Sequence, residues 1–327
     1  MRYIIYGTGA IGGVVGAKLF MHGKDVILIA RGAQLQALKA NGLTLRYPDG
    51  EVNLQIPTVG HPNEIGFQKD DVVVMCVKSQ DSQAALAELR AAAGDQVNVL
   101  CCQNGLDNER MALRLFPNVY AQVVFMPAMY LEPGIVECST WPKSGVFDLG
   151  RYPRGTDATA EAIARDFDDS DMLSNAEPNI MSYKYTKMLQ ILANPVQAVC
   201  GLTDAGDIVD RIRAEATACY DAAGFDYVTM EVAQKRQMMS SRTTSGRLGG
   251  ASTWQSLQRG AGSIEVDYLN GEVALLGRLH GVPTPANESL QMFADSMARN
   301  RQAPGSVSPD AVRAEIARRE GAATGAK

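Results

Sequence analysis

Three glycines near the start of the chain have a spacing that suits the binding of phosphate groups. Gly7, Gly9 and Gly12 form a Gly-x-Gly-x-x-Gly pattern directly behind the apolar residues 3–6. In a strand–turn–helix unit, the first glycine permits a tight turn and the second lets a pyrophosphate approach the backbone. The third lets the helix pack closely on the strand. The alternative is a glycine-rich turn that serves packing alone.

The pattern predicts that a dinucleotide binds to backbone N–H groups at the positive end of the following helix. The predicted cofactor-binding loop consists of Gly7, Thr8, Gly9, Ala10, Ile11 and Gly12. The second strand of the unit, residues 25–30, ends before Arg31. NAD-binding units usually place an acidic residue there, whereas a guanidinium pairs with a 2′-phosphate. We therefore expect NADP or NADPH; the alternative is a solvated surface arginine.

Two polar residues follow later strands of the same half of the chain. Lys78 follows the apolar run 71–77, and Asn104 follows the run 97–102. Strands of a doubly wound sheet deliver ligand contacts at their carboxyl ends. We expect Lys78 to meet cofactor phosphate or a substrate carboxylate, and Asn104 to contact both cofactor and substrate. The alternative is that each residue only starts a helix or a turn.

A helix in the second half carries two lysines that share a face. Lys184 and Lys187 are three residues apart, and Asn194 follows about two turns after Lys187. Desolvation lowers the pKa of a lysine and lets it give up a proton. A carboxylate beside it, such as Glu265, would orient it. We expect these residues to contact the substrate. The alternative for the two lysines is a solvated helix face. The alternative for Glu265 is an acid at the start of a helix that complements the helix dipole.

The elements that must position these residues fall into two classes. Strand and helix alternate through the first half, which predicts a parallel sheet covered by helices, whereas only helices are expected from about residue 180. A hairpin is expected over residues 43–59, one helix over 180–199 and another over 263–280. The expected domains are a nucleotide-binding domain at 1–178, a helical catalytic domain at 179–302 and a mobile tail with a short helix at 303–327.

The composition excludes several other classes of protein. The net charge of −5 provides no basic field for nucleic acid, and no apolar stretch is long enough to span a bilayer. The three histidines are far apart in the sequence, so no metal site is expected. Six scattered cysteines and a first strand at the very start, with no signal peptide, predict reduced thiols in a cytoplasm.

These residues together carry a resemblance to the ketopantoate reductase (2-dehydropantoate 2-reductase) family, over residues 1 to about 300. The specific motifs are Val77-Lys78-Ser79, Gln103-Asn104-Gly105, Asn194-Pro195 and the sequence IEVDYLNGE at residues 264–272. The resemblance implies a Rossmann-type domain followed by a helical domain like the carboxyl-terminal domain of 6-phosphogluconate dehydrogenase, with the active site between them. It also implies NADPH-dependent reduction of 2-dehydropantoate to pantoate, a step of pantothenate and coenzyme A synthesis.

The resemblance also implies roles for single residues. Arg31 matches the arginine that binds the 2′-phosphate, Lys187 the catalytic lysine and Glu265 the acidic partner of the substrate. The serine that contacts substrate in the family lies twelve residues before that glutamate. This position is Thr253, with Ser252 adjacent, so either hydroxyl is a candidate.

The chain departs from the family pattern one turn after the catalytic lysine. Family members commonly have an asparagine there, whereas this chain has Ile191 with Gln190 beside it. Loss of a hydrogen bond to a substrate hydroxyl strongly changes how an enzyme discriminates between substrates with and without that hydroxyl. The alternatives are therefore a reductase of another branched 2-oxo acid and, from a different class, a non-catalytic NADP-sensing protein. The oligomeric state is open, with a homodimer as one alternative.

Overall fold

The computed structural model describes residues 1–201, 204–239 and 250–324 and divides the chain into two compact units. The first unit contains Met1–Lys184 and Val228–Arg247, and the second contains Tyr185–Tyr227 and Leu248–Lys327. The expected domain limits at residues 178 and 302 stay a prediction.

The first unit is built on a seven-stranded sheet with the order β11-β8-β7-β6-β1-β2-β5. Its strands are β1 (Arg2–Tyr6), β2 (Asp25–Ile29), β5 (Thr58–Val59), β6 (Val72–Met75), β7 (Asn98–Cys101), β8 (Val119–Gln122) and β11 (Leu149–Arg151). All neighbours pair in parallel except β11, which is antiparallel to β8. Strands β1, β6 and β7 are nearly continuous apolar runs because both of their faces are buried.

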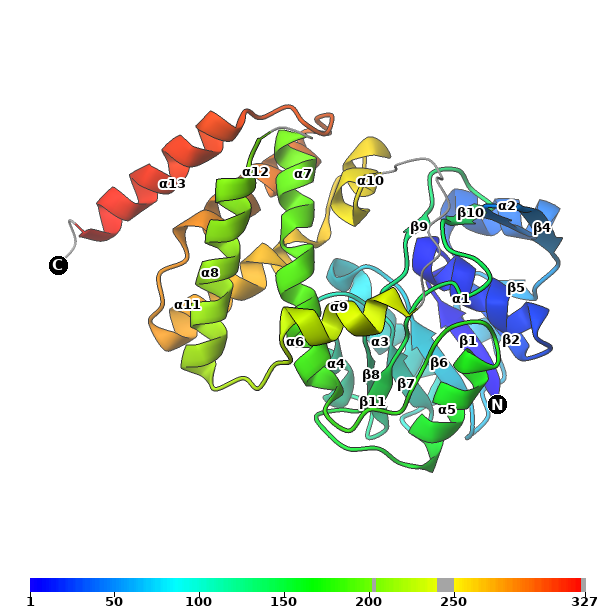
Figure 1. The fold of residues 1–327 in the computed structure, drawn as a ribbon. Coiled ribbons are helices and arrows are strands. Elements are labelled where there is room, and N and C mark those ends of the chain that lie inside the picture. The colour runs from blue at the N-terminus through cyan, green and yellow to red at the C-terminus, as the bar shows by residue number, and fades with distance from the viewer. Residues whose placement is uncertain (202–203, 240–249, 325–327) are drawn as a thin grey trace. The chain divides into compact units, whose positions relative to one another are not determined.

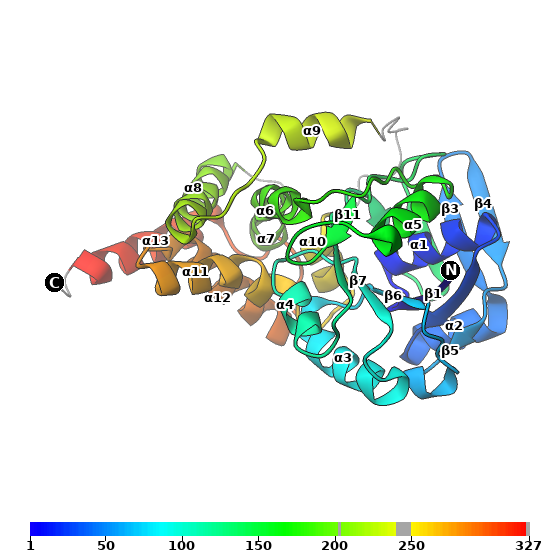
Figure 2. The same ribbon diagram turned by 90° about the horizontal axis from the view of Figure 1, so that it is seen from below.

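Helices cover both faces of this sheet, so the predicted doubly wound arrangement is confirmed (Figures 1 and 2). The helices of the unit are α1 (Ala10–Met21), α2 (Gly32–Asn41), α3 (Ser79–Ala93), α4 (Asn108–Leu113), α5 (Ala158–Asp168) and α9 (Met230–Met238), with the short η1 (Pro62–Glu64). Apolar residues of α1 and α5 share one buried core, and those of α3 and α4 contribute to a second core. The β1–α1 connection places the amino terminus of α1 at the carboxyl edge of the sheet.

A second, four-stranded sheet packs against α1 with the order β4-β3-β10-β9. It contains β3 (Leu43–Tyr47), β4 (Gly50–Leu54), β9 (Ala128–Met129) and β10 (Ile135–Cys138). The antiparallel pairing of β3 with β4 confirms the hairpin expected around residues 47–50. The expected hairpin was too long, however, because β5 leaves it and pairs in parallel with β2 of the main sheet.

The glycine loop has the backbone geometry that its sequence predicts. Gly7 has a φ of 101°, a conformation that L side chains rarely adopt, and a Cβ there would lie 2.7 Å from the Val77 nitrogen. A Cβ on Gly12 would lie 2.2 Å from the Gly7 carbonyl oxygen, so only glycine permits this approach of α1. A Cβ on Gly9 would meet nothing within 4 Å, so the middle of the loop is open.

The second unit is helical, as expected, although two expected helices are divided. Its elements are α6 (Ile180–Ile191, which begins in the first unit), α7 (Ala193–Cys200), α8 (Gly206–Ala223), α10 (Ser252–Gln258), η2 (Glu265–Tyr268), α11 (Asn270–His280), α12 (Pro285–Arg299) and α13 (Pro309–Thr324). Pro195 has no N–H to donate to the Ile191 carbonyl, which explains why α6 and α7 separate at Leu192. Leu269 leaves helical geometry and separates η2 from α11.

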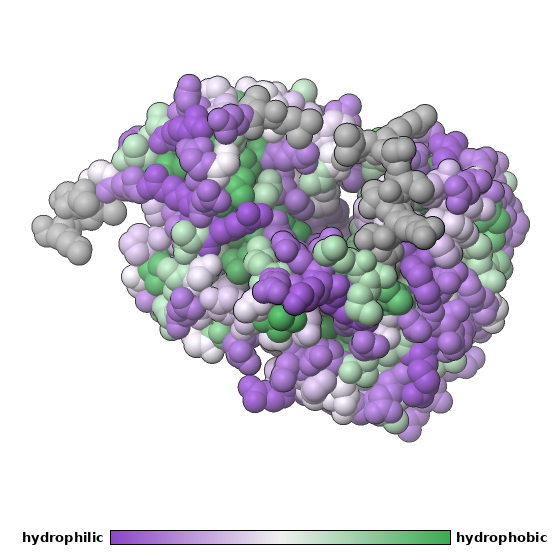
Figure 3. Space-filling view, in the orientation of Figure 1, coloured by the Kyte–Doolittle hydropathy of each residue, from purple (hydrophilic) through white to green (hydrophobic). Residues whose placement is uncertain are grey.

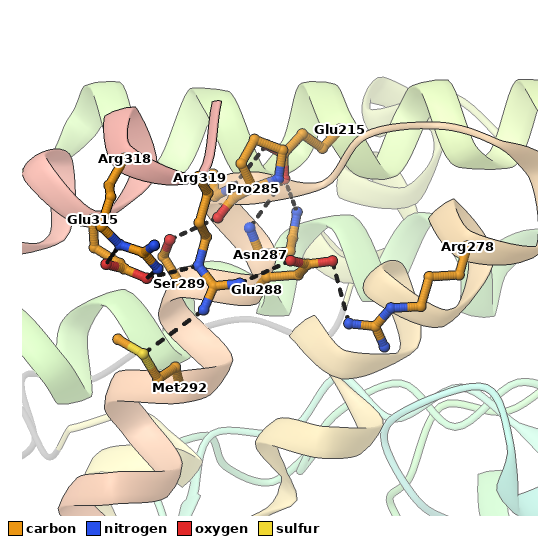
Figure 4. A network of polar contacts seen from close by, with 11 residues as sticks. Glu215, Arg278, Pro285, Asn287, Glu288, Ser289, Met292, Glu315, Arg318 and Arg319 are labelled. Atoms are coloured by element: carbon orange, nitrogen blue, oxygen red, sulfur yellow. Dashed lines mark hydrogen bonds and ion pairs between the residues drawn. The ribbon is translucent and has the colours of Figure 1, made fainter. Parts of the chain in front are cut away.

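The carboxyl-terminal segment contains a helix that is longer than the short helix expected there. Helix α13 packs on α12, and its Val312 and Ile316 are buried. Arg319 donates to Glu315 and to Glu288 of α12, both at 2.9 Å (Figure 4). Arg318 above all, together with Arg319, lowers the pKa of Glu315 to about 2. The helix of the tail is therefore longer than expected, and the mobility of the tail stays a prediction.

Other expectations concern what the described residues lack. No described helix is long and apolar enough to cross a membrane. No group of three described histidine, cysteine, aspartate or glutamate residues is placed to hold a metal ion. All six cysteines are free thiols. The face shown in Figure 3 is covered mainly by hydrophilic residues, with smaller apolar areas.

The contrast between Gly12 and Gly9 yields a stability prediction. We expect Gly12→Ala to lower the free energy of unfolding by about 1–3 kcal/mol, because the new methyl group would overlap a backbone oxygen that has little room to shift. Gly9→Ala adds the same methyl group in open space and should cost less than about 1 kcal/mol. Thermal or urea unfolding of both variants measures the difference. Equal losses of the free energy of unfolding in the two variants would contradict the close packing of α1 at Gly12.

Candidate active site

The glycine loop is tied to the end of strand β2 and presents an uncapped helix. The Gly7 N–H and the Thr8 hydroxyl both donate to the Ile29 carbonyl at 3.1 Å, and Gln34 donates to the Thr8 carbonyl at 2.8 Å. Thr8 is buried, so its side chain has a structural partner. Gly9 is the N-cap of α1, and no side chain among the described residues caps this helix. Backbone donors at its first turn are therefore available to an anion.

Arg31 lies directly beyond strand β2, where the sequence places it. It is the N-cap of α2, and its side chain is 65% exposed. Its guanidinium lies 3.6 Å from the Asp81 carboxylate in the first turn of α3. This is a solvent-exposed pair and contributes little to stability. The arginine is thus a solvent-accessible cation at the carboxyl edge of the sheet.

The ends of strands β6 and β7 are joined by a buried side chain. Gln103 follows β7, and its amide nitrogen donates to the Val77 carbonyl and to the Ser82 hydroxyl, both at 2.8 Å. These bonds fix the segment that precedes Lys78 against the segment that precedes Asn104. Lys78 is the half-buried N-cap of α3, and Asn104 is half-buried in the turn after β7.

A second buried amide holds the turn that contains Asn104. The Asn108 amide nitrogen donates to the Asn104 carbonyl at 2.9 Å and to the Ser79 hydroxyl at 3.2 Å. Its amide oxygen accepts from Ser82 at 2.8 Å. The structure therefore places the Lys78 and Asn104 backbones on one connected polar network.

Sequence reasoning did not single out Gln103, Ser82 or Asn108 for a role of this kind. A polar residue in the middle of a predicted helix or turn is usually solvated, so nothing in its type reveals that it is buried. The available signal was the position of Gln103, which lies between a buried strand and a candidate ligand contact.

The structure corrects the expected role of Lys184 as a substrate contact. Lys184 is buried, and its ammonium lies 2.6 Å from a Glu109 carboxylate oxygen. It also donates to the carbonyls of Gln103 at 2.9 Å and Gln122 at 3.3 Å. All of these groups belong to the first unit. Sequence reasoning missed Glu109, which is fully buried.

Lys187 lies one turn further along α6, in the second unit, and has a different environment. It is half-buried, and desolvation lowers its pKa to about 8. Asn194, in the first turn of α7, is also half-buried, whereas Ile191 is buried. A lysine with this pKa is protonated below pH 8 and is able to donate a proton near neutral pH.

The remaining candidates of the second unit lie at two short helices. Thr253 is buried and Ser252 is half-buried in the first turn of α10. The Ala251 N–H, just before them, donates to the Gln197 side chain of α7 at 2.8 Å and so ties α10 to α7. Glu265 is buried in η2.

The IEVDYLNGE motif is held to the rest of the second unit by polar bonds. Asn270 donates to Asn287 at 2.9 Å, and Asn287 donates to the Glu215 carboxylate at 2.8 Å (Figure 4). Asp267 accepts from Gln291 at 2.8 Å. Asn270 and Asp267 therefore have structural partners.

The residues of the first unit fit a dinucleotide. The loop is open at Gly9, no described side chain caps α1, and a solvent-accessible guanidinium stands at the end of β2. Gly7 to Gly12 would hold the pyrophosphate through backbone N–H groups, and Arg31 would hold an adenosine 2′-phosphate. The described residues thus supply donors for both anionic groups.

Comparison with known proteins identifies the family. Residues 3–154 match the model of the ketopantoate reductase PanE/ApbA domain, and residues 179–297 match the model of its carboxyl-terminal domain. A 2-dehydropantoate 2-reductase of Pyrococcus horikoshii is 28% identical over 298 residues, covering 88% of this chain and 94% of that protein. One of Mesorhizobium japonicum is 27% identical and covers 92% of this chain and 99% of that protein.

Solved structures share the fold over most of the chain. A PanE/ApbA family ketopantoate reductase from Ralstonia eutropha has 25% identity and a TM-score of 0.77, covering 92% of this chain and 99% of that chain. A D-mandelate dehydrogenase bound to NADH and anilino(oxo)acetate has 24% identity and a TM-score of 0.80, with the same coverage. This chain therefore belongs to the ketopantoate reductase family of nicotinamide-dependent oxidoreductases that act on a CH–OH group.

Proposed function

We propose that the protein reduces 2-dehydropantoate to pantoate with NADPH, a step of pantothenate and coenzyme A synthesis. The observation that carries this proposal is Lys187, whose pKa is lowered to about 8 at the position that matches the catalytic lysine of the family. The naming of several relatives as 2-dehydropantoate 2-reductases supports the substrate. Membership of an enzyme family favours catalysis over the alternative of a non-catalytic NADP sensor.

Each proposed residue has a defined task. Bound NADPH supplies the hydride that reduces the keto carbon. Lys187 polarises the carbonyl group and donates a proton to the developing alkoxide. Glu265 orients the lysine and the substrate, Asn104 holds cofactor ribose and substrate, and Lys78 binds the cofactor.

Further polar groups of the second unit are proposed for the rest of the substrate. Asn194 and either Ser252 or Thr253 would donate to its hydroxyl and carboxylate groups, since a buried polar group without a partner is costly. A cytoplasmic location and a homodimer stay predictions.

The NADPH preference is tested at Arg31. A charge-assisted contact with a 2′-phosphate contributes about 1.5–3 kcal/mol, so Arg31→Ala should weaken NADPH binding by about 10- to 150-fold and leave NADH binding unchanged. Calorimetric titration with both cofactors measures this. Arg165→Ala, which removes an exposed arginine of α5, is the control with the same change in charge. Equal NADPH and NADH affinities of the unaltered protein would sink the assignment.

The role of Lys187 predicts both a rate and a pH dependence. Lys187→Ala should lower kcat by about 10²–10⁴-fold while NADPH still binds. Because the protonated lysine is the acid and its pKa is about 8, kcat/KM for reduction should fall as the pH rises through 8. Lys235→Ala removes an exposed lysine of α9 and serves as control. A variant at Lys187 that keeps its turnover would refute this role.

One specific observation favours a second candidate substrate. Ile191, a buried apolar residue, stands where the family commonly has asparagine. A structural neighbour in the same fold is a D-mandelate dehydrogenase, which shows that the fold accommodates other substrates. The second candidate is therefore a branched 2-oxo acid without the distal hydroxyl, such as 2-oxoisovalerate.

The two substrates are separated by exchanging Ile191. Our proposal predicts that ketopantoate has the higher kcat/KM in the unaltered protein, and that Ile191→Asn keeps its kcat and lowers its KM. The second candidate predicts that 2-oxoisovalerate is preferred and that Ile191→Asn reverses the order, because a polar group then replaces apolar surface. Steady-state rates of both acids with both proteins decide between them.

A further inference from the structure

We infer that Lys184 is a positioning residue that fixes the turn carrying Asn104 through the Gln103 carbonyl. The inference rests on the proposed function only in so far as Asn104 contacts cofactor and substrate. It deepens that proposal by assigning the two lysines of α6 to different tasks. Lys187 is the residue proposed for the chemistry, and Lys184 orients Asn104.

Three acceptors of the first unit surround the ammonium of Lys184. A lysine carries three N–H donors, and Lys184 has three acceptors within reach. These are the Glu109 carboxylate at 2.6 Å and the carbonyls of Gln103 and Gln122 at 2.9 and 3.3 Å. The side chain is only 4% exposed, so water does not replace any of them.

The two carbonyls that Lys184 binds follow or end neighbouring strands. Gln103 lies two residues beyond β7, and Gln122 is the last residue of β8. Carbonyls at the ends of strands need a donor when they are buried. A single ammonium therefore satisfies both and ties the two strand ends to helix α6.

The Gln103 carbonyl belongs to the peptide bond that joins Gln103 to Asn104. Lys184 thus holds the peptide plane before Asn104. Asn108 holds the plane after it, because it donates to the Asn104 carbonyl at 2.9 Å. With both planes fixed, the direction of the Asn104 side chain is restricted before any ligand binds. A misplacement of about 1 Å in such a residue can cost about 10²-fold in rate.

Glu109 neutralises the buried positive charge of the Lys184 ammonium. Its side chain is fully buried, and neither carboxylate oxygen has a hydrogen-bond partner among the described residues, so its contact with Lys184 is an ion pair. Removal of the lysine alone would leave an uncompensated buried carboxylate and strongly destabilise the unit. A double replacement by apolar side chains of similar size is tolerated far better.

The test therefore uses Lys184→Met together with Glu109→Leu. The control is Arg2→Met together with Asp71→Asn, which removes a pair with an N–O distance of 2.6 Å at the opposite, amino-terminal edge of the same sheet. Hydrogen exchange of the backbone amides of residues 103–108 is measured first. We expect exchange to rise by about tenfold or more in the Lys184/Glu109 variant and to be unchanged there in the control, since local protection reports local ordering.

Ligand binding and kinetics then separate positioning from a general loss of stability. The Lys184/Glu109 variant should bind 2′,5′-ADP, which lacks the nicotinamide half, within about twofold of the unaltered protein. Its kcat with NADPH should fall by about 10- to 100-fold, as expected for a misplaced orienting group. The control variant should retain kcat whatever its melting temperature.

Two outcomes would overturn the inference. One is unchanged exchange of residues 103–108 in the Lys184/Glu109 variant. The other is a kcat within twofold of the unaltered protein. If the unaltered protein reduces no 2-oxo acid with NADPH, the proposed function fails and the exchange measurement alone decides the role of Lys184.

Discussion

The structure of the first unit depends on how the backbone groups at the carboxyl ends of its parallel strands are satisfied. A strand that ends inside the protein leaves N–H and C=O groups that must find partners. At β1 and β2 the glycine loop provides them, because the Gly7 N–H binds the Ile29 carbonyl and α1 then packs closely. At β6, β7 and β8 side chains provide them, namely Gln103, Asn108 and Lys184. At the same edge, a Cβ on Gly9 would meet nothing within 4 Å, and no described side chain caps α1.

The two lysines of helix α6 show how environment separates identical side chains. Lys184 and Lys187 are three residues apart, and the sequence assigns them to one face. Lys184 is neutralised by Glu109 and saturated by carbonyls, whereas desolvation lowers the pKa of Lys187. A paired ammonium is useful as a fixed cross-link, and an ammonium with a lowered pKa is useful as an acid. The three-residue spacing of the lysines predicts neither the ion pair of Lys184 nor the lowered pKa of Lys187.

What the sequence predicted well was local. The tight turn at Gly7, the close packing at Gly12, the place of Arg31 after β2 and the alternation of strands and helices follow from short-range backbone requirements. The structure has these features. The missed features depend on contacts between distant residues. Glu109 lies 75 positions before Lys184, and β5 joins the main sheet instead of the hairpin. The packing of α13 on α12 likewise includes a contact between distant residues, because Arg319 donates to Glu288, 31 positions earlier. The break between helices α6 and α7, after Ile191, could have been predicted from Pro195.

The central claim is that an NADP molecule binds with its pyrophosphate at the start of α1 and its 2′-phosphate at Arg31. A crystal structure of the protein with NADP⁺ tests this most directly. The account predicts that N–H groups of residues 9–12 lie within about 3 Å of the pyrophosphate oxygens and that the Arg31 guanidinium contacts the 2′-phosphate. A 2′-phosphate bound elsewhere, with Arg31 still directed to Asp81, would contradict it.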